Sequence, residues 1–468
     1  DMGVSVFKTK LENISKQESI RFDVKYRRFF DVDHAKSDIA KDYVRIGDIL
    51  KVFPCKKIKK GELENNIEMI DISSVDDNTA TLEEVVCNVD SIGSDKNILT
   101  NGDILISKIV MSKGYIWVNG KSGNELIGSS EIIPYILRDE MVDLDFLKYM
   151  LILPQMLKIY TYLETGKTPS QKRVNPKELL QIRIPKVPYC IQNKIGDKIR
   201  TTQEKNSYLR SQVLNFSGVI DDVFSEELHM QHKSMKLTKM YIKKNFLIGK
   251  DFDLRLSYKY NNSFFDDQIV DDYQIIPFRE FLAEPMKMGK SISPDLYDEE
   301  GEAKYIAMSS IKNWCINYEE SKAVTEQYYE ENKRKSCIQI NDILMARSGE
   351  GTIGKVALVE KNEEALCADF IIRIRLKEDV NKKFMYYYMR SFLFQLYVER
   401  EKKGLGNNTN IFPKQINRIP VVCISQKQQH RIVSILSLKE EEICAAILNL
   451  DNNKLKIENE IVNSYRGD

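Results

Sequence analysis

The sequence predicts an α/β protein with two tandem mixed α/β domains, each followed by a long helix. Three observations predict this fold: a long internal repeat, short β-branched segments within each repeat, and an apolar heptad pattern after each repeat. The 468 residues are too many for one compact core and suit two or three domains. A hydrophobic fraction of 42% and a charged fraction of 30% are typical of a packed globular protein.

The repeat consists of segment pairs that occur in the same order in both halves. The pairs are 21–24 (RFDV) with 251–254 (DFDL), 101–106 (NGDILI) with 340–345 (INDILM), 114–118 with 354–358, 132–136 with 370–374, 144–163 with 383–399, 182–185 with 417–420, and 192–195 with 428–432. Asp103 and Asp342 lie 239 residues apart, and Pro185 and Pro420 lie 235 apart. Because the order holds while loop lengths vary, we infer a duplication.

Each repeat reads as a mixed α/β domain. Residues 341–346 and 355–360 are short and β-branched, which predicts strands. Residues 144–163 and 383–399 have helical patterns that end at Gly166 and Gly404, since glycine readily adopts the conformation that terminates a helix.

After each Ile-Pro pair the periodicity becomes that of a coiled-coil seam. The apolar positions are Ile191, Ile195, Ile199, Leu209, Val213, Phe216, Ile220 and Val223, then Ile432, Leu436, Ile443, Ile447, Leu450, Ile457 and Ile461, with Lys454 at one seam position. Helices of about 35 residues span roughly 50 Å, and that length favours packing on each other. The predicted boundaries are 1–186 and 246–421 for the domains, and 187–245 and 422–468 for the helices.

The composition excludes several classes of protein. No apolar stretch reaches the length of a membrane span, and the N-terminal ten residues lack an apolar signal core, so we expect a cytoplasmic protein. The eight cysteines include no C-x-x-C pair, which argues against a structural zinc site. The net charge of +1 neither indicates nor excludes nucleic-acid binding, which needs only local basic surface.

The duplicated order of an Asp-Ile-Leu strand, a glycine turn, a helix, Ile-Pro, Gln and a heptad helix resembles the specificity (S) subunit of a Type I restriction-modification enzyme. The resemblance covers nearly the whole chain and includes the closely related Type IIB-like S subunits. It implies two target recognition domains that each read half of a split DNA site, and two helices that form an antiparallel coiled coil. It also implies two methyltransferase (M) subunits and motor-nuclease (R) subunits as partners.

Candidate DNA contacts follow from side-chain chemistry and position. Arginine pairs bidentately with guanine, lysine holds phosphate, and asparagine or glutamine reads adenine. Around the glycine turns the candidates are Lys108, Lys113, Arg347 and Lys355; after the helix ends they are Lys167, Thr168, Gln171, Lys172, Arg173, Lys402, Lys403, Asn407, Asn408 and Lys414.

Other motifs offer competing interpretations. Residues 349–354 spell G-x-G-x-x-G, but the following segment predicts a strand, so we expect a hairpin turn and not a dinucleotide site. Asp295, Glu302 and Lys304 mimic a metal-dependent nuclease core. His229 and His232 lack an evident third metal ligand.

We therefore expect a non-catalytic DNA-recognition and scaffold subunit without a cofactor, with S-adenosylmethionine bound by the partner methyltransferase. Two alternatives stay open: a self-sufficient nuclease, and a coiled-coil protein scaffold without DNA contact.

Overall fold

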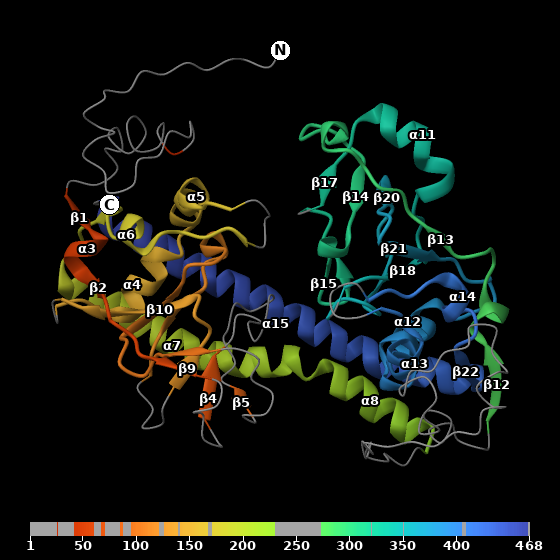
Figure 1. The fold of residues 1–468 in the computed structure, drawn as a ribbon. Helices are drawn as coiled ribbons and strands as arrows, with labels where there is room; N and C mark the ends of the chain where they lie inside the picture. The colour runs from red at the N-terminus through yellow and green to blue at the C-terminus, as the bar shows by residue number, and fades with distance from the viewer. Residues whose placement is uncertain are drawn as a thin grey trace. The chain divides into compact units, whose positions relative to one another are not determined.

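The computed structural model divides the chain into two units. Unit 1 comprises Asp1–Arg210 together with Ala446–Asp468, and unit 2 comprises Ser211–Ala445. Figure 1 labels many of the elements of both units. The repeated segments 21–24 and 251–254 lie outside the residues that the structure describes. The described residues are Tyr26, 42–59, 67–70, 85–87, 95–120, 126–138, 141–166, 171–229, 273–319, 321–349, 351–404 and 409–466.

Unit 1 is built around an antiparallel sheet of order β2-β10-β7-β8. A second sheet has the order β3-β6-β9-β4-β5, and β1 pairs with β11. The strands are β1 (Tyr43–Arg45), β2 (Leu50–Val52), β3 (Lys57–Ile58), β4 (Ile67–Ile70), β5 (Val85–Cys87), β6 (Lys96–Ile98), β7 (Ile104–Ser107), β8 (Ile116–Val118), β9 (Leu126–Gly128), β10 (Ile132–Leu137) and β11 (Arg183–Pro185). Short helices are α3 (Ile46–Ile49), η5 (Met111–Lys113) and α6 (Pro176–Leu179).

Unit 2 is built around an antiparallel sheet of order β13-β21-β18-β19. Further sheets are β17-β14-β20, β12-β22 and β15-β16. The strands are β12 (Gln274–Pro277), β13 (Lys287–Met288), β14 (Lys304–Ile306), β15 (Ile311–Lys312), β16 (Cys315–Ile316), β17 (Lys322–Ala323), β18 (Ile343–Ala346), β19 (Val356–Leu358), β20 (Ala365–Cys367), β21 (Ile371–Ile374) and β22 (Pro420–Cys423). The helices include α11 (Glu326–Ser336), α14 (Pro413–Ile416), η8 (Phe278–Phe281), η9 (Pro294–Leu296) and η10 (Met308–Ser310).

The two units repeat one topology, which confirms the predicted duplication. The sheet β2-β10-β7-β8 corresponds strand for strand to β13-β21-β18-β19, and the pair β1-β11 corresponds to β12-β22. Each unit also contains one parallel pair, β4 with β9 and β14 with β20. The strands β7 (ILIS) and β18 (ILMA) are buried along their whole length, as expected for central strands that are apolar at every position except Ser107.

The repeated aspartate that precedes β7 and β18 has a structural role. In unit 1, Asp103 accepts a hydrogen bond at 2.9 Å from the backbone N–H of Leu137. In unit 2, Asp342 accepts one at 2.8 Å from the N–H of Gln339 and pairs with Arg375 at 2.7 Å. The carboxylate therefore satisfies partly buried donors at the start of the central strand.

Both predicted domain helices are interrupted, which corrects the expectation of one helix each over 144–163 and 383–399. The first forms α4 (Leu144–Leu151) and α5 (Pro154–Leu163), because Pro154 lacks an N–H and opens a new helix at its first position. The second forms α12 (Lys382–Arg390) and α13 (Phe392–Glu401), separated by the extended residue Ser391.

The predicted long helices are α7 (Tyr189–Leu214), α8 (Phe216–Glu227) and α15 (Gln426–Arg466). The central helix is broken at Asn215, and residues 230–245 of its predicted range lie outside the described residues. At 41 residues, α15 is about 60 Å long. None of the described helices is long and apolar enough to cross a bilayer.

Each unit packs its own part of α15. In unit 1, Ile195 and Ile199 of α7 share a core cluster with Ile457 and Ile461 of α15. In unit 2, Phe224 of α8 contacts the rings of Phe384 and Tyr388, while Ile432, Leu436 and Ile443 of α15 are buried. Fully burying such a side chain stabilises the fold by about 1.5–3 kcal/mol. The seam is incomplete at its first position, because Ile191 is 36% exposed.

Candidate nucleic-acid interface

The structure brings the two sets of candidate residues together in each unit. In unit 1, the loop after β7 meets the segment after α5 through isolated bridges that join Ile109 and Thr165 to Arg173. The backbone N–H of Val110 donates to the carbonyl of Lys172 at 2.9 Å, and the N–H of Val174 donates to that of Lys108 at 2.8 Å. We call residues 108–115 and 164–174 loop pair 1.

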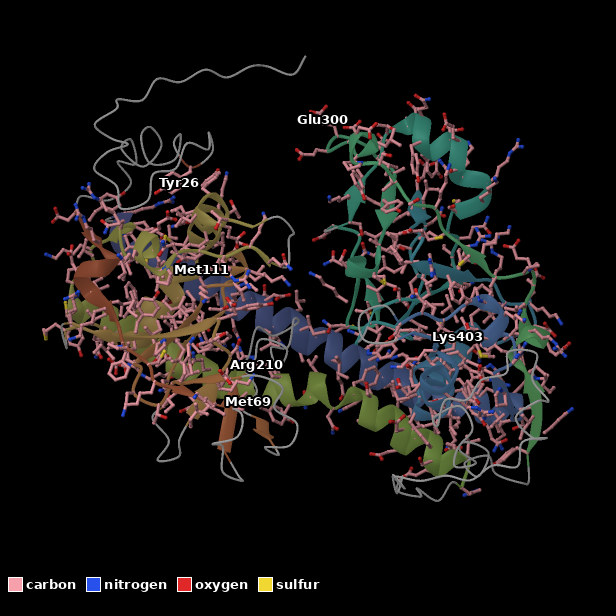
Figure 2. The ribbon with its side chains drawn as sticks, viewed as in Figure 1. Tyr26, Met69, Met111, Arg210, Glu300 and Lys403 are labelled. Atoms are coloured by element: carbon pink, nitrogen blue, oxygen red, sulfur yellow. The ribbon has the colours of Figure 1, made fainter. Side chains whose placement is uncertain are left out.

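Unit 2 contains the equivalent arrangement. Isolated bridges join Ser348 and Lys403 to Asn410, and the N–H of Ile411 donates to the carbonyl of Arg347 at 2.9 Å. We call residues 347–355 and 402–411 loop pair 2. Figure 2 labels Met111 in the first loop pair and Lys403 in the second.

Loop pair 1 is rich in cations that are already paired with carboxylates. Arg173 donates two hydrogen bonds to Glu131, at 3.0 and 3.1 Å, and Lys108 lies 3.7 Å from the same carboxylate. The hydrogen bond to Glu131, together with its negative charge, raises the pKa of Arg173. Lys172 lies 3.9 Å from Glu164, whose side chain is almost fully buried. Two carboxylates therefore compensate part of the positive charge of Lys108, Lys172 and Arg173 within the protein.

Two other candidates of loop pair 1 extend toward solvent. Lys113 is exposed at the end of η5, with its ammonium 5.9 Å from the centre of the Tyr115 ring. Gln171 is exposed as well. Lys167 and Thr168 lie outside the described residues.

In loop pair 2, Arg347 is held by neutral groups. Its Nε donates to the backbone carbonyl of Asp369 at 2.8 Å, and its Nη1 donates to the side-chain oxygen of Asn410 at 3.2 Å. The guanidinium lies 5.1 Å from the centre of the Phe370 ring and 5.3 Å from that of Phe412. Both rings are about 40% exposed, so this cation is fixed in orientation beside accessible aromatic surface.

The remaining candidates of unit 2 differ in their surroundings. Lys355 is half-buried directly before β19, and Lys414 is exposed on α14. Lys402 pairs with Glu399 at 2.6 Å and is only 19% exposed. Lys403 is half-buried, and its N–H donates to the carbonyl of Asn410 at 2.8 Å. Asn407 and Asn408 lie outside the described residues.

The glycine-rich segment 349–354 forms a turn between two antiparallel strands, which confirms the predicted hairpin. Met345 of β18 pairs with Val356 of β19, and no helix follows the turn. Gly349 adopts a φ of 86°, a conformation that glycine reaches without strain. Its counterpart in unit 1 is Val110, with a φ of 47°, which is a strained conformation for a β-branched residue.

The other motifs singled out in the sequence are separate from the loop pairs. Asp295 lies in η9 and Glu302 is exposed shortly before Lys304 begins β14. His229 is exposed just after α8, and His232 lies outside the described residues. In the part of the chain that the structure describes, no three His, Cys, Asp or Glu side chains gather where they could hold a metal ion.

Sequence reasoning missed the side chains that touch the candidate cations, among them Glu131, Phe370 and Phe412. Glu131 directly precedes β10 and Phe370 directly precedes β21. The two positions are equivalent, because the N–H of Lys108 donates to the Glu131 carbonyl and that of Arg347 donates to the Phe370 carbonyl. The alignment of 132–136 with 370–374 placed Ile132 opposite Phe370, so the hydrogen bonds correct its register by one residue.

The family model of the Type I restriction modification DNA specificity domain matches residues 40–215 and again residues 272–456. These matches cover more than half of the chain, so the chain belongs to this family. It carries two copies of the domain, one for each half of the duplication, and is a DNA sequence-specificity subunit.

Solved structures of related subunits are similar at low identity. The HsdS subunit from Thermoanaerobacter tengcongensis is 13% identical over 91% of this chain and 97% of its own, with a TM-score of 0.32. The Type I restriction-modification S subunit from M. genitalium is 13% identical over 92% and 97%, with a TM-score of 0.42. A chain from a study of type I R-M complex assembly and conformational transition is 12% identical over 91% and 98%, with a TM-score of 0.36. No curated protein matches the chain. The family match carries the assignment.

Proposed function

We propose that the chain reads a split DNA target, with one half-site read by each unit. The observation that carries this proposal is the duplication itself: two DNA specificity domains share one sheet topology and present equivalent loop pairs. Because each unit has its own loops, each reads its own bases.

Loop pairs 1 and 2 supply the contacts in this proposal. Arg347 is the base-reading residue of unit 2, because its guanidinium is oriented and arginine pairs bidentately with guanine. Exposed lysines such as Lys113 and Lys414 hold phosphates, which position the protein without reading sequence.

The helices act as a spacer between the half-sites and form an antiparallel coiled coil in this proposal. Contacts within the units support the antiparallel direction. In unit 1, Lys198 forms an ion pair with Glu460 at 2.8 Å, and the Asn453 amide donates a hydrogen bond to Asn206 at 2.8 Å. Residue numbers therefore increase along α7 while those of their partners decrease along α15, which is the antiparallel direction. In unit 2, Glu227 pairs with Arg431 at 2.8 Å.

The same proposal assigns the chemistry to partner subunits. Two methyltransferase subunits dock on the helices, with a pseudo-twofold relation that follows from the duplication, and motor-nuclease subunits join them. The chain itself is non-catalytic and cytoplasmic, and S-adenosylmethionine binds the methyltransferase. Support comes from the family match, which assigns DNA recognition to both halves.

A binding selection tests this proposal. The full-length chain is incubated with random duplexes at two salt concentrations, and bound sequences are read out. We expect a bipartite motif with a fixed gap, and an affinity that falls steeply with salt. Binding without sequence preference, or a single undivided motif, would refute the proposal. Mass measurement with the methyltransferase tests the two-to-one stoichiometry, and a saturated one-to-one complex would contradict it.

A further inference from the structure

In each unit, three side chains at equivalent positions meet in the loop pair, and one of them is a candidate DNA-contacting cation. In unit 1 they are Lys108, Glu131 and Arg173, which we call triplet 1. In unit 2 the same positions hold Arg347, Phe370 and Asn410, which we call triplet 2. The equivalence rests on matching backbone hydrogen bonds: positions 108 and 347 donate to 131 and 370, at 2.9 and 3.0 Å. Positions 173 and 410 form the matching bridges.

The side chains at these positions give both triplets a formal charge of +1 but hold the cations differently. In triplet 1, one carboxylate contacts both cations, at 3.0 Å for Arg173 and 3.7 Å for Lys108. In triplet 2, the cation lies against a phenyl ring and an amide oxygen, and no carboxylate in the described part of unit 2 forms an ion pair with it. The residue directly before β10 or β21 therefore decides whether a carboxylate pairs with the cation.

We propose that positions 131 and 370 determine base specificity in the two units. This inference rests on the proposed DNA recognition. Glu131 is 21% exposed, and a carboxylate has about four acceptor sites for the three contacts that it makes here. It therefore offers an acceptor to DNA and selects a base with a major-groove amino donor, cytosine N4 or adenine N6. The acceptor-only edge of guanine is repelled.

Phe370 has the opposite effect in unit 2. Its ring keeps the Arg347 guanidinium in place without neutralising it. Triplet 2 therefore presents guanidinium donors and an aromatic edge without a carboxylate, which suits the two acceptors of guanine. The same backbone thus selects an amino donor in one unit and a guanine in the other.

Reciprocal substitutions test this inference in the full-length chain. Glu131→Gln removes the negative charge but keeps the shape, and glutamine both donates and accepts. We expect the variant to accept guanine at one position of one half-site, with discrimination there reduced about tenfold. The salt slope should become steeper by about one, because a compensated cation becomes available to phosphate. Glu204→Gln, an exposed carboxylate on α7, is the matched control and should change neither.

In unit 2, the carboxylate introduced by Phe370→Glu should form an ion pair with Arg347. We expect this variant to lose the guanine preference at one position of the other half-site. Phe370→Gln, which adds no charge, should keep it, so the pair separates charge from lost packing. Ile275→Glu, on β12 and 39% exposed, controls for placing a carboxylate on unit 2. Circular dichroism confirms that each variant is folded.

The random-duplex selection gives distinct outcomes. If the wild-type chain selects no motif, the proposed function fails and this inference falls with it. If the wild type selects a bipartite motif that Glu131→Gln and Phe370→Glu leave unchanged, this inference alone is wrong. If Phe370→Gln loses guanine as fully as Phe370→Glu, ring packing and not charge sets the preference, which also overturns it.

Discussion

Beside the apolar packing, an arginine joins the long helices to the domain in each unit: the arginine of unit 1 is partly exposed, whereas that of unit 2 is buried. Arg200 of α7 contacts Asp143, Asp145 and Asp197 at 2.8–3.0 Å, and its side chain is 40% exposed. Arg390 of α12 is 2% exposed and pairs with Glu440 of α15 at 2.8 Å. The two duplicated domains thus hold their long helices with arginines of very different solvent exposure.

The environment of Arg390 explains why its burial is tolerated. The guanidinium lies 4.5 Å from the centre of the Phe216 ring, 5.2 Å from Trp314 and 5.0 Å from Tyr386. Aromatic faces and one carboxylate replace the water that the cation has lost. Burial raises the pKa of Tyr386, so its hydroxyl stays protonated as a neighbour of Glu440.

The largest effect that we expect from this comparison is on stability. Arg390→Ala should lower the free energy of unfolding of unit 2 by about 3–5 kcal/mol, because it leaves the Glu440 carboxylate, which is only 15% exposed, without its nearest cation. Arg200→Ala should cost unit 1 less, about 1 kcal/mol, since solvent screens the ion pairs of a side chain that is 40% exposed and Asp143 keeps its hydrogen bond from the N–H of Phe146. Denaturant titrations of variants that keep a single tryptophan, Trp117 in unit 1 or Trp314 in unit 2, follow the unfolding of each unit separately, with the folded baseline measured for each variant. Equal losses of unfolding free energy in Arg390→Ala and Arg200→Ala would contradict the expected difference between the two arginines.

The second effect concerns the loop pairs. Arg347→Ala should weaken binding to the target by about 1–3 kcal/mol if it reads a guanine. Lys108→Ala should cost less, because the Lys108 ammonium is already paired with Glu131. Arg347→Lys is the control that keeps the charge but loses the bidentate geometry.

Mobility-shift assays measure the affinity of each variant for the target and for a duplex in which that guanine is replaced. The expected result is that Arg347→Ala equalises the two affinities. A uniform loss on both duplexes would make Arg347 a phosphate contact.

The sequence predicted the duplication, the central strands and the hairpin, because apolar runs and glycine positions are local signals. It also located the loops that carry the candidate contacts. It did not predict the neighbours of those cations: Glu131 is 23 positions from Lys108 and reaches it only through the β7–β10 register. Nor did it predict the helix break at Ser391, which no proline marks.

A third effect compares the left-handed residues of the two turns. Gly349→Val should destabilise unit 2 by about 1–2 kcal/mol, because a Cβ carries a left-handed penalty and would lie 2.7 Å from the Thr352 hydroxyl. Val110→Gly should be nearly neutral, within about 0.5 kcal/mol, because relief of the same penalty is offset by greater freedom of the unfolded chain. Thermal unfolding of each variant checks this. If Val110→Gly were strongly destabilised, the packing of the Val110 side chain would contribute more to stability than its backbone strain costs.

The smallest effect separates exposed from paired lysines. Lys113 is exposed, whereas Lys402 is 19% exposed and paired with Glu399 at 2.6 Å. If Lys113 holds a phosphate, Lys113→Ala should weaken binding to every sequence alike by about 1 kcal/mol or less, and flatten the salt slope by about 0.9. Lys402→Ala should change the slope less, because its charge is already compensated. Affinities measured from low to physiological salt on target and unrelated duplexes give both slopes. Should Lys402→Ala flatten the slope more than Lys113→Ala, DNA binding must break the Glu399 pair, and compensation in the free protein would no longer predict which cations DNA uses.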